Sequence, residues 1–142
     1  LGFNFGVQGA QFTATSTTAE NQMLSNSMYV HSIPNNNDNQ DVVSMGTNSS
    51  SATRRVIENA YQVLAIEFVA IVQAVEYLGV ESKLSSYTQD LYKEIKTITP
   101  PFVEDTTMYA RNTAVKEYLQ SKRLDIFDTQ TEVSKTSMNG TH

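Results

Sequence analysis

The chain of 142 residues contains no cysteine. This absence excludes disulfides, thiolate metal sites and a cysteine nucleophile, and it fits a reducing compartment, so we expect a cytoplasmic protein. Histidine is also scarce, because only His31 and His142 occur and they lie far apart. Neither has a second histidine or a carboxylate at metal-ligand spacing on a helix, so the sequence predicts no metal site.

Positive charge is scarce as well. Ten Lys+Arg stand against fifteen Asp+Glu, which gives a formal net charge of -5, and no basic run is longer than a pair. Such a surface lacks the basic footprint that nucleic acids and anionic membranes attract. The longest apolar-rich run, "VLAIEFVAIVQAV" at 63–75, is interrupted by Glu67 and Gln73 and is too short to span a membrane. We therefore expect neither nucleic acid nor membrane as a partner.

Familiar catalytic and leader motifs are absent too. The chain has no G-x-S-x-G nucleophile elbow and no glycine-rich phosphate loop. Its first residues, "LGFNFGVQGAQF", begin with Leu1 and do not match a signal peptide, so we expect a piece of a longer polypeptide. With 39% hydrophobic and 18% charged residues, the composition is that of a chain that folds.

The spacing of small and apolar residues predicts a first helix over about residues 7–25. One stripe of this helix carries Val7, Ala10, Ala14, Thr17 or Thr18, Asn21 and Leu24. Its threonines and Gly9 lower the helix propensity, so tertiary contacts must hold it in place. A strand is the alternative interpretation of the threonines, but the alternation with a period of two is poor here.

A second helix is predicted from Ser51 or Thr53 to Leu78, where Gly79 supplies a C-terminal stop. Near its start, Arg54 and Glu58 lie one turn apart and are expected to pair. Its later part, "LAIEFVAIV", is apolar on nearly every side, and a helix of that kind must be enclosed. We therefore expect other chains or further segments to cover it.

Two more helices and a tail complete the predicted organisation. A third helix fits the apolar spacing of 84–98 and ends before the prolines at 100 and 101, and a fourth fits 105–119. Residues 128–142 are polar and aperiodic, and we expect them to be mobile unless they dock. The fold predicted for residues 1–127 is all-α, with long helices and a long ordered loop near residues 26–50.

That loop contains the stretch "SIPNNNDNQDVVSMG" at 32–46, with four asparagines, one glutamine and two aspartates. A loop of this length inside a compact domain is uncommon unless it binds something. Amides offer donors and acceptors without charge, so they can orient a polar ligand but carry protons poorly. Composition alone leaves a solvated spacer and a binding loop both open, although Ile33, Val42 and Val43 would anchor the loop to a core.

Two stretches of the chain closely resemble the aromatic amino acid ammonia-lyase family, which comprises histidine, phenylalanine and tyrosine ammonia-lyases. The first runs from "LGFNFGVQGAQF" through "SIPNNNDNQDVVSMGTNSS", and the second is "VIENAYQVLAIEFVAIVQAVEYLG". The strings "DNQDVVSMG" and "VLAIE" stand at the family's spacing, and the resemblance covers about residues 1–120. It is strongest to bacterial tyrosine ammonia-lyases.

The resemblance implies an all-helical, fumarase-like enzyme that assembles as a homotetramer around a central helix bundle and acts on a small aromatic amino acid. It also implies a methylidene-imidazolone electrophile (MIO), formed by cyclisation of an internal Ala-Ser-Gly. This chain contains no Ala-Ser-Gly. We therefore expect the C-terminal part of such an enzyme, inactive by itself, whose partners are the upstream part and other subunits.

The resemblance also assigns the site residues. Gln40 falls where phenylalanine and tyrosine lyases carry Gln and histidine lyases carry Glu, and Asn39 precedes it as in both groups. Asn36 falls where plant phenylalanine lyases place Glu and tyrosine lyases tend to place Asn. These three residues are implied to line the pocket and to hold the substrate or the MIO ring, whereas Asp41 is structural. None of them is expected to be the base.

The implied reaction is elimination of ammonia from an L-aromatic amino acid, with tyrosine favoured, to give an arylacrylate. A neutral amide at Gln40 suits a phenyl or phenol ring, whereas a carboxylate there could pair with imidazole. Histidine ammonia-lyase and an MIO-dependent aminomutase stay open as alternatives. So does a non-catalytic helical piece that serves only assembly.

Overall fold

The computed structural model describes residues 5–34, 37, 39 and 44–122. Within these residues every regular element is a helix, which confirms the predicted all-α class. The elements are α1 (Gln8–Leu24), η1 (Met28–His31), α2 (Gly46–Leu78), η2 (Glu81–Lys83), α3 (Ser86–Ile98) and α4 (Met108–Ser121). The predicted polar tail, 128–142, lies outside the described residues.

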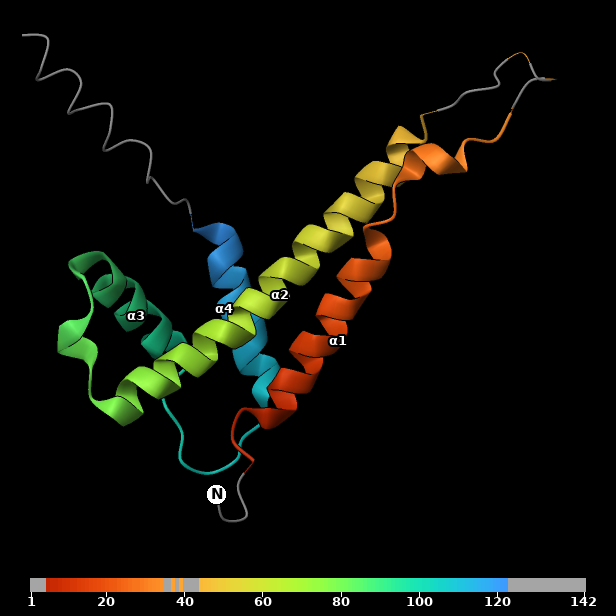
Figure 1. The fold of residues 1–142 in the computed structure, drawn as a ribbon. Coiled ribbons are helices and arrows are strands. Elements are labelled where there is room, and N and C mark those ends of the chain that lie inside the picture. Colours follow the sequence, from red (N-terminus) through yellow and green to blue (C-terminus); the bar gives the residue numbers. More distant parts are fainter. Residues whose placement is uncertain (1–4, 35–36, 38, 40–43, 123–142) are drawn as a thin grey trace, which may run out of the picture.

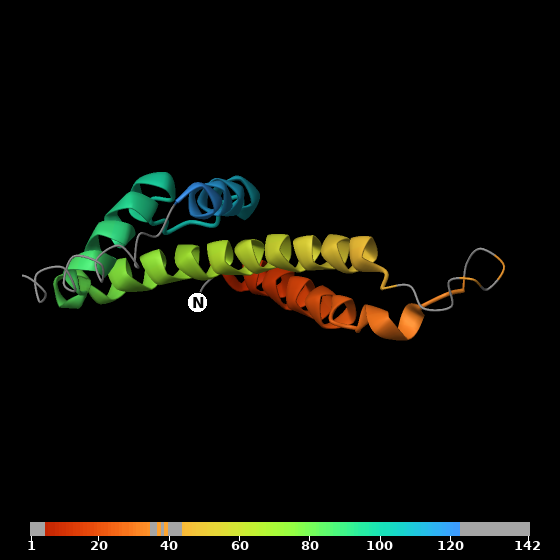
Figure 2. The same cartoon turned by 90° about the horizontal axis from the view of Figure 1, so that it is seen from above.

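The long helix α2 is the axis against which the other helices pack. It has 33 residues, which corresponds to a length of about 50 Å. In Figure 1, α1 runs antiparallel to α2 along its first half, and Figure 2 shows α1 on one side of α2 with α3 and α4 on the other. The described part of the chain is thus a long helix with a layer on each of two sides.

The apolar core lies between α2, α3 and α4. Its buried members are Ala65, Val69, Val72 and Val75 of α2, Tyr92 and Ile95 of α3, and Val115 of α4. On α2 these residues recur at spacings of three and four, so they form one face of the helix. That face turns away from α1.

The stripe of small residues predicted on α1 is the face that meets α2. Ala10 is buried, and the later members Ala14, Thr17, Asn21 and Leu24 are half-buried. Small side chains let two helices approach closely, but they bury little apolar surface. Ala10 is the one buried residue of α1, so apolar contacts alone hold this helix weakly.

The second helix begins earlier than predicted, at Gly46 rather than at Ser51 or Thr53. The hydroxyl residues that suggested a cap there do not act as one. Thr53 Oγ1 instead donates to the carbonyl of Ser49 at 2.9 Å, one turn back inside the helix. The helix starts where Met45 adopts a left-handed conformation with φ 49°, and the connection from α1 therefore covers 25–45 rather than 26–50.

The remaining boundaries follow local backbone chemistry. Gly79 ends α2 in a left-handed conformation with φ 63°, as predicted, because a residue without Cβ adopts this conformation without strain. Ser85 caps α3 by accepting a hydrogen bond from the Thr88 N–H at 3.3 Å. The fourth helix begins at Met108 rather than near Asp105.

Asp105 acts on a different helix. Its carboxylate accepts hydrogen bonds from the N–H groups of Phe5 and Gly6 at 2.9 Å and 2.8 Å, just before α1 begins. A carboxylate at this end of a helix also interacts favourably with the positive end of the helix dipole. The connection between α3 and α4 is therefore tied to the start of α1.

Gln73, which interrupts the apolar run of α2, has a structural function. Its amide donates to the carbonyl of Phe102 at 2.7 Å and accepts from the Phe102 N–H at 3.1 Å.

By length and composition α2 could span a membrane, and it is the one helix in the described ranges that is long and apolar enough to do so. Since a core helix passes the same test and α2 makes polar contacts with its neighbours, we interpret it as a core helix.

A glutamate held by two donors one turn apart joins each pair of neighbouring helices, and we call these contacts carboxylate clamps. Glu20 is held by Arg55 and Asn59, Glu58 by Lys116 and Gln120, Glu76 by Tyr92 and Lys96, and Glu94 by Tyr118 and Lys122. In each clamp the two donors lie at positions i and i+4 of one helix, and therefore on one face.

One clamp corrects a predicted pairing. The sequence suggested an ion pair between Arg54 and Glu58 within α2, but the salt bridge of Glu58 runs to Lys116 of α4 at 2.8 Å. Arg54 acts on Glu58 only through its charge. The tertiary contact therefore replaces the local one, because Glu58 faces α4.

The clamps lower the pKa of all four glutamates below the ordinary value of 4.5. In each case the hydrogen bond from the lysine or arginine is the largest cause, and the second donor adds to it. Reciprocally, the hydrogen bond to Glu76 is the main cause that raises the pKa of Lys96 to about 12.

These shifts predict how the stability depends on pH. A carboxyl whose pKa is lower in the folded state stabilises that state fully above its unfolded pKa of 4.5, and the stabilisation is lost as the pH falls through the lowered value. We expect the midpoint of thermal unfolding, followed by circular dichroism, to drop as the pH falls below 4.5. Glu76→Gln should make this dependence shallower, and equal slopes in the two proteins would contradict the clamp.

Candidate functional site

The connection between α1 and α2, at 25–45, starts from a well-bonded end of α1. The Ser25 hydroxyl donates to the carbonyl of Gln22 at 2.7 Å, and the Asn26 amide donates to the carbonyl of Met23 at 2.9 Å. These bonds satisfy carbonyls that the helix leaves without an intrahelical partner. The short helix η1 follows, and His31 lies exposed at its end.

Only one of the three predicted pocket residues falls within the described residues. Asn39 lies in a turn and is exposed, whereas Asn36 and Gln40 lie outside the described ranges, as does Asp41. Asn37, two residues before Asn39, has a left-handed conformation with φ 53°, which asparagine tolerates better than most residues. The turn therefore depends on an asparagine that the sequence analysis did not select.

The predicted anchoring of this loop is wrong for Ile33 within this chain. Its side chain is 64% exposed, so it does not enter the core of α2, α3 and α4. The other two predicted anchors, Val42 and Val43, lie outside the described residues. Ile33 therefore lies outside the apolar core of the described helices.

The first turn of α2 opens onto two hollows beside the loop. One has a volume of about 590 Å³ and is lined by Ser44, Ser49, Ser50, Thr53 and Arg54, among others. The other, of about 380 Å³, lies toward α1 and is lined by Asn21, Ser25, Ser27 and Ser49, among others. The residue before α2, Met45, makes no capping hydrogen bond with its side chain. Serine and threonine hydroxyls line both hollows at the base of the loop.

This arrangement suits recognition of a polar ligand rather than proton transfer. The amino end of a helix favours negative charge, and amides and hydroxyls add directed hydrogen bonds. In the part of the chain that the structure describes, no cluster of three His, Cys, Asp or Glu side chains could hold a metal ion. The described groups around the loop therefore suit orientation of a ligand by hydrogen bonds.

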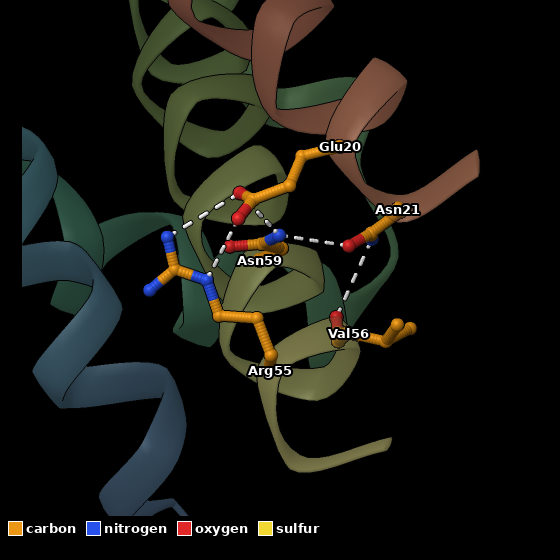
Figure 3. A network of polar contacts seen from close by, with 5 residues as sticks. All are labelled: Glu20, Asn21, Arg55, Val56 and Asn59. Atoms are coloured by element: carbon orange, nitrogen blue, oxygen red, sulfur yellow. Dashed lines mark hydrogen bonds and ion pairs between the residues drawn. The ribbon is translucent and has the colours of Figure 1, made fainter. Parts of the chain in front are cut away.

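Sequence reasoning missed the polar contacts just below the loop. Glu20 and Asn21 near the end of α1 bind Arg55 and Asn59 of α2, as Figure 3 shows. The signal was present, because Arg55 and Asn59 stand four residues apart and can serve one carboxylate together. Periodicity of apolar residues does not report such contacts.

The family model for aromatic amino acid lyases matches residues 1–97. The chain belongs to the aromatic amino acid lyase family. Among the curated relatives of this lyase-family chain is a histidine ammonia-lyase of Staphylococcus saprophyticus. It is 40% identical over 119 residues, which cover 84% of this chain and 24% of the relative.

Two aminomutases are similar to the same region. An MIO-dependent tyrosine 2,3-aminomutase of Streptomyces globisporus is 38% identical over 107 residues, 75% of this chain and 20% of the relative. The solved structure of a phenylalanine aminomutase of Pantoea agglomerans aligns with a TM-score of 0.81 and 30% identity, covering 85% of this chain and 23% of that one. The lyase-family chain thus spans about a quarter or less of the length of these relatives.

Proposed function

We propose that this chain is the C-terminal helical part of an ammonia-lyase that eliminates ammonia from an L-aromatic amino acid and gives an arylacrylate. The membership of residues 1–97 in the aromatic amino acid lyase family carries this proposal. The polar surroundings of the loop at the start of α2 support it, because they suit a zwitterionic ligand. A cytoplasmic location is part of the same proposal.

Tyrosine is the substrate that we favour. Gln40 and Asn36 match the residues that the resemblance implies for tyrosine ammonia-lyases, and a neutral amide has no charge to attract imidazole. Histidine is a second candidate, because the relative from Staphylococcus saprophyticus is named a histidine ammonia-lyase. An aminomutase reaction is a third, because relatives with 38% and 30% identity carry that name.

The MIO group would come from a segment other than this chain, which has no Ala-Ser-Gly to form it. The amides that this chain offers fit contact with a neutral heterocycle, since they donate and accept without charge. When bound, MIO supplies the electrophile that makes the amino group a viable leaving group. Asn36, Asn39 and Gln40 would hold the substrate or this ring by hydrogen bonds, and the proton would go to a base outside this chain.

The exposed side of α2 supports the proposed homotetramer. Four aliphatic residues recur every seven positions along it and stay exposed in the chain alone, namely Ile57, Leu64, Ile71 and Leu78. A repeat of seven is the pattern by which one helix packs along another. Exposed apolar stripes of this kind mark interaction surfaces. We propose that helices of other subunits cover this face in a central bundle.

The activity can be tested on the full-length enzyme in which the proposal places this chain. We expect incubation with tyrosine to release coumarate and ammonia without β-tyrosine, as measured by chromatography of the products. Accumulation of β-tyrosine would instead establish an aminomutase, and urocanate from histidine alone would establish a histidine lyase. Absence of product from tyrosine, phenylalanine and histidine would refute the proposed function.

The amide residues can be tested by kinetics in the same enzyme. Gln40→Ala and Asn39→Ala should each lower kcat/KM roughly five- to tenfold, the effect of one lost hydrogen bond. Asn37→Gly is the matched control, because it removes an amide from the same loop and keeps the left-handed conformation at φ 53°. The assignment fails if Asn37→Gly slows turnover as much as the two alanine variants do.

Substitutions at two neighbouring positions of α2 distinguish a defect in assembly from a defect in folding. Ile71 is 43% exposed and belongs to the apolar stripe, whereas Val69 is 2% exposed in the chain's own core. Ile71→Asp should keep the helical circular dichroism and reduce the mass measured by light scattering from that of a tetramer. Val69→Asp should lose the helical circular dichroism, because a buried unpaired carboxylate lowers the free energy of unfolding by about 3 to 5 kcal/mol.

Ser82→Asp, an exposed position in η2, is the control and should change neither signal. A variant with Asp at position 71 that still forms tetramers would show that the stripe is not the interface.

A further inference from the structure

Four polar side chains join α1 to α2 just below the loop, and we call them the α1–α2 network. Asn59 Nδ2 donates to Glu20 Oε2 and to Asn21 Oδ1, both at 2.9 Å. Arg55 donates to both oxygens of Glu20, at 3.1 Å and 3.3 Å. Asn21 donates in turn to the carbonyl of Val56 at 3.4 Å. Figure 3 shows these contacts converging between the two helices.

The network is satisfied only in one register of the two helices. Asn59 is 6% exposed, and both hydrogens of its amide have acceptors on α1. A shift of α1 along α2 by one turn, about 5.4 Å, would remove both acceptors and leave a buried amide unpaired. A single buried asparagine sets the register of paired helices in coiled coils for the same reason.

Apolar contacts cannot set this register by themselves. The face of α1 that meets α2 consists mostly of alanines, threonines and Asn21, with Leu24 at its end, and Ala10 is its one buried residue. Small residues form shallow ridges, so neighbouring registers bury similar apolar area. The polar network is therefore the feature that distinguishes one register from the next.

The register matters because the two helices are the stems of the loop. The connection 25–45 leaves α1 after Leu24 and enters α2 at Gly46, and it carries Asn39. Glu20 and Asn21 lie in the last turns of α1, and Arg55 and Asn59 lie in the third and fourth turns of α2. Sliding one stem along the other therefore displaces one end of the loop relative to the other.

We propose that Glu20, Asn21, Arg55 and Asn59 are positioning residues for the reaction, and this inference rests on the proposed function. Their hydrogen bonds run to one another and to the carbonyl of Val56, and they hold α1 and α2, which carry the two ends of the amide loop, in one register. A displacement of about 1 Å at a reacting group can lower turnover by about a hundredfold.

The main test is Asn59→Leu in the full-length enzyme, because leucine has a similar size and no amide. We expect kcat for the amino acid substrate to fall by about ten- to a hundredfold, measured at a temperature at which circular dichroism shows the variant to be folded. The variant removes the donor that Glu20 and Asn21 share, so the melting temperature should fall as well. A purely structural role predicts this fall without the loss of kcat in the folded enzyme. An unchanged kcat would overturn the inference.

A second pair of variants changes Glu20, a half-buried member of the network. The Glu20 side chain is 41% exposed. Glu20→Leu should lower kcat as Asn59→Leu does. Glu20→Gln keeps an acceptor for Asn59 and should restore kcat to within about twofold of the wild type. Equal loss in the glutamine and leucine variants would contradict the role of the hydrogen bond.

The register itself can be measured without any assay of activity. The chain has no cysteine, so two spin labels can be placed on it, at Met23→Cys in α1 and Ser50→Cys in α2, with any cysteines in other segments replaced by serine. Pulsed electron paramagnetic resonance measures the distances between the two labels. In Asn59→Leu we expect their distribution to shift or broaden by several ångströms, up to the rise of about one helical turn. An unchanged distribution would refute control of the register.

Asn112→Leu is the matched control, because Asn112 is also 6% exposed but lies on α4. It should leave kcat and the label distance unchanged. Equal effects of Asn112→Leu and Asn59→Leu would show a general disturbance and overturn the inference. If the wild-type enzyme converts no aromatic amino acid, the proposed function fails, and the label distances then support or refute the register by themselves.

Discussion

Carboxylates held by two donors one turn apart keep the helices of this chain in place, and the rest of the structure depends on them. The apolar core between α2, α3 and α4 supplies most of the driving force for packing. Apolar packing is not directional, whereas a glutamate that accepts hydrogen bonds from donors at positions i and i+4 fixes where one helix contacts another. Between α1 and α2 the clamp adds to a contact in which α1 contributes no residue to the buried apolar core.

The helices themselves were predictable from the sequence, because their spacing is a local property. The small-residue stripe of α1, the apolar face of α2 and the stop at Gly79 all appear as predicted. The predicted start of α2 failed, because hydroxyl residues that can cap a helix can equally bond to a carbonyl within it, as Thr53 does. Such a choice depends on the backbone before the helix, in particular on Met45.

The clamps could not be predicted in the same way. Glu58 has a possible partner one turn away in Arg54, yet it pairs with Lys116, which is far along the chain. Sequence patterns report neighbours on one helix, whereas the pairing across helices depends on which faces meet. Asn59 illustrates the point, since nothing in the string Glu58-Asn59-Ala60 indicates that its amide has two acceptors on another helix.

The resemblance to the aromatic amino acid lyase family identified the candidate site, more than the composition of the loop did. Composition left the amide loop as either a spacer or a binding segment, and the family assignment made Asn36, Asn39 and Gln40 candidates for contact. The described part of the site, Asn39 and the first turn of α2, is open to solvent.

The bond between Asp105 and the backbone before α1 has a consequence for the order of folding. It joins residues 100 positions apart, Asp105 and Phe5, and so closes a loop that contains α1, α2 and α3. Closing so long a loop is entropically unfavourable until other contacts have brought its ends together. We therefore expect the hydrogen bonds from Phe5 and Gly6 to Asp105 to form late, after the packing of α1 and α3 on α2 has brought the two ends together.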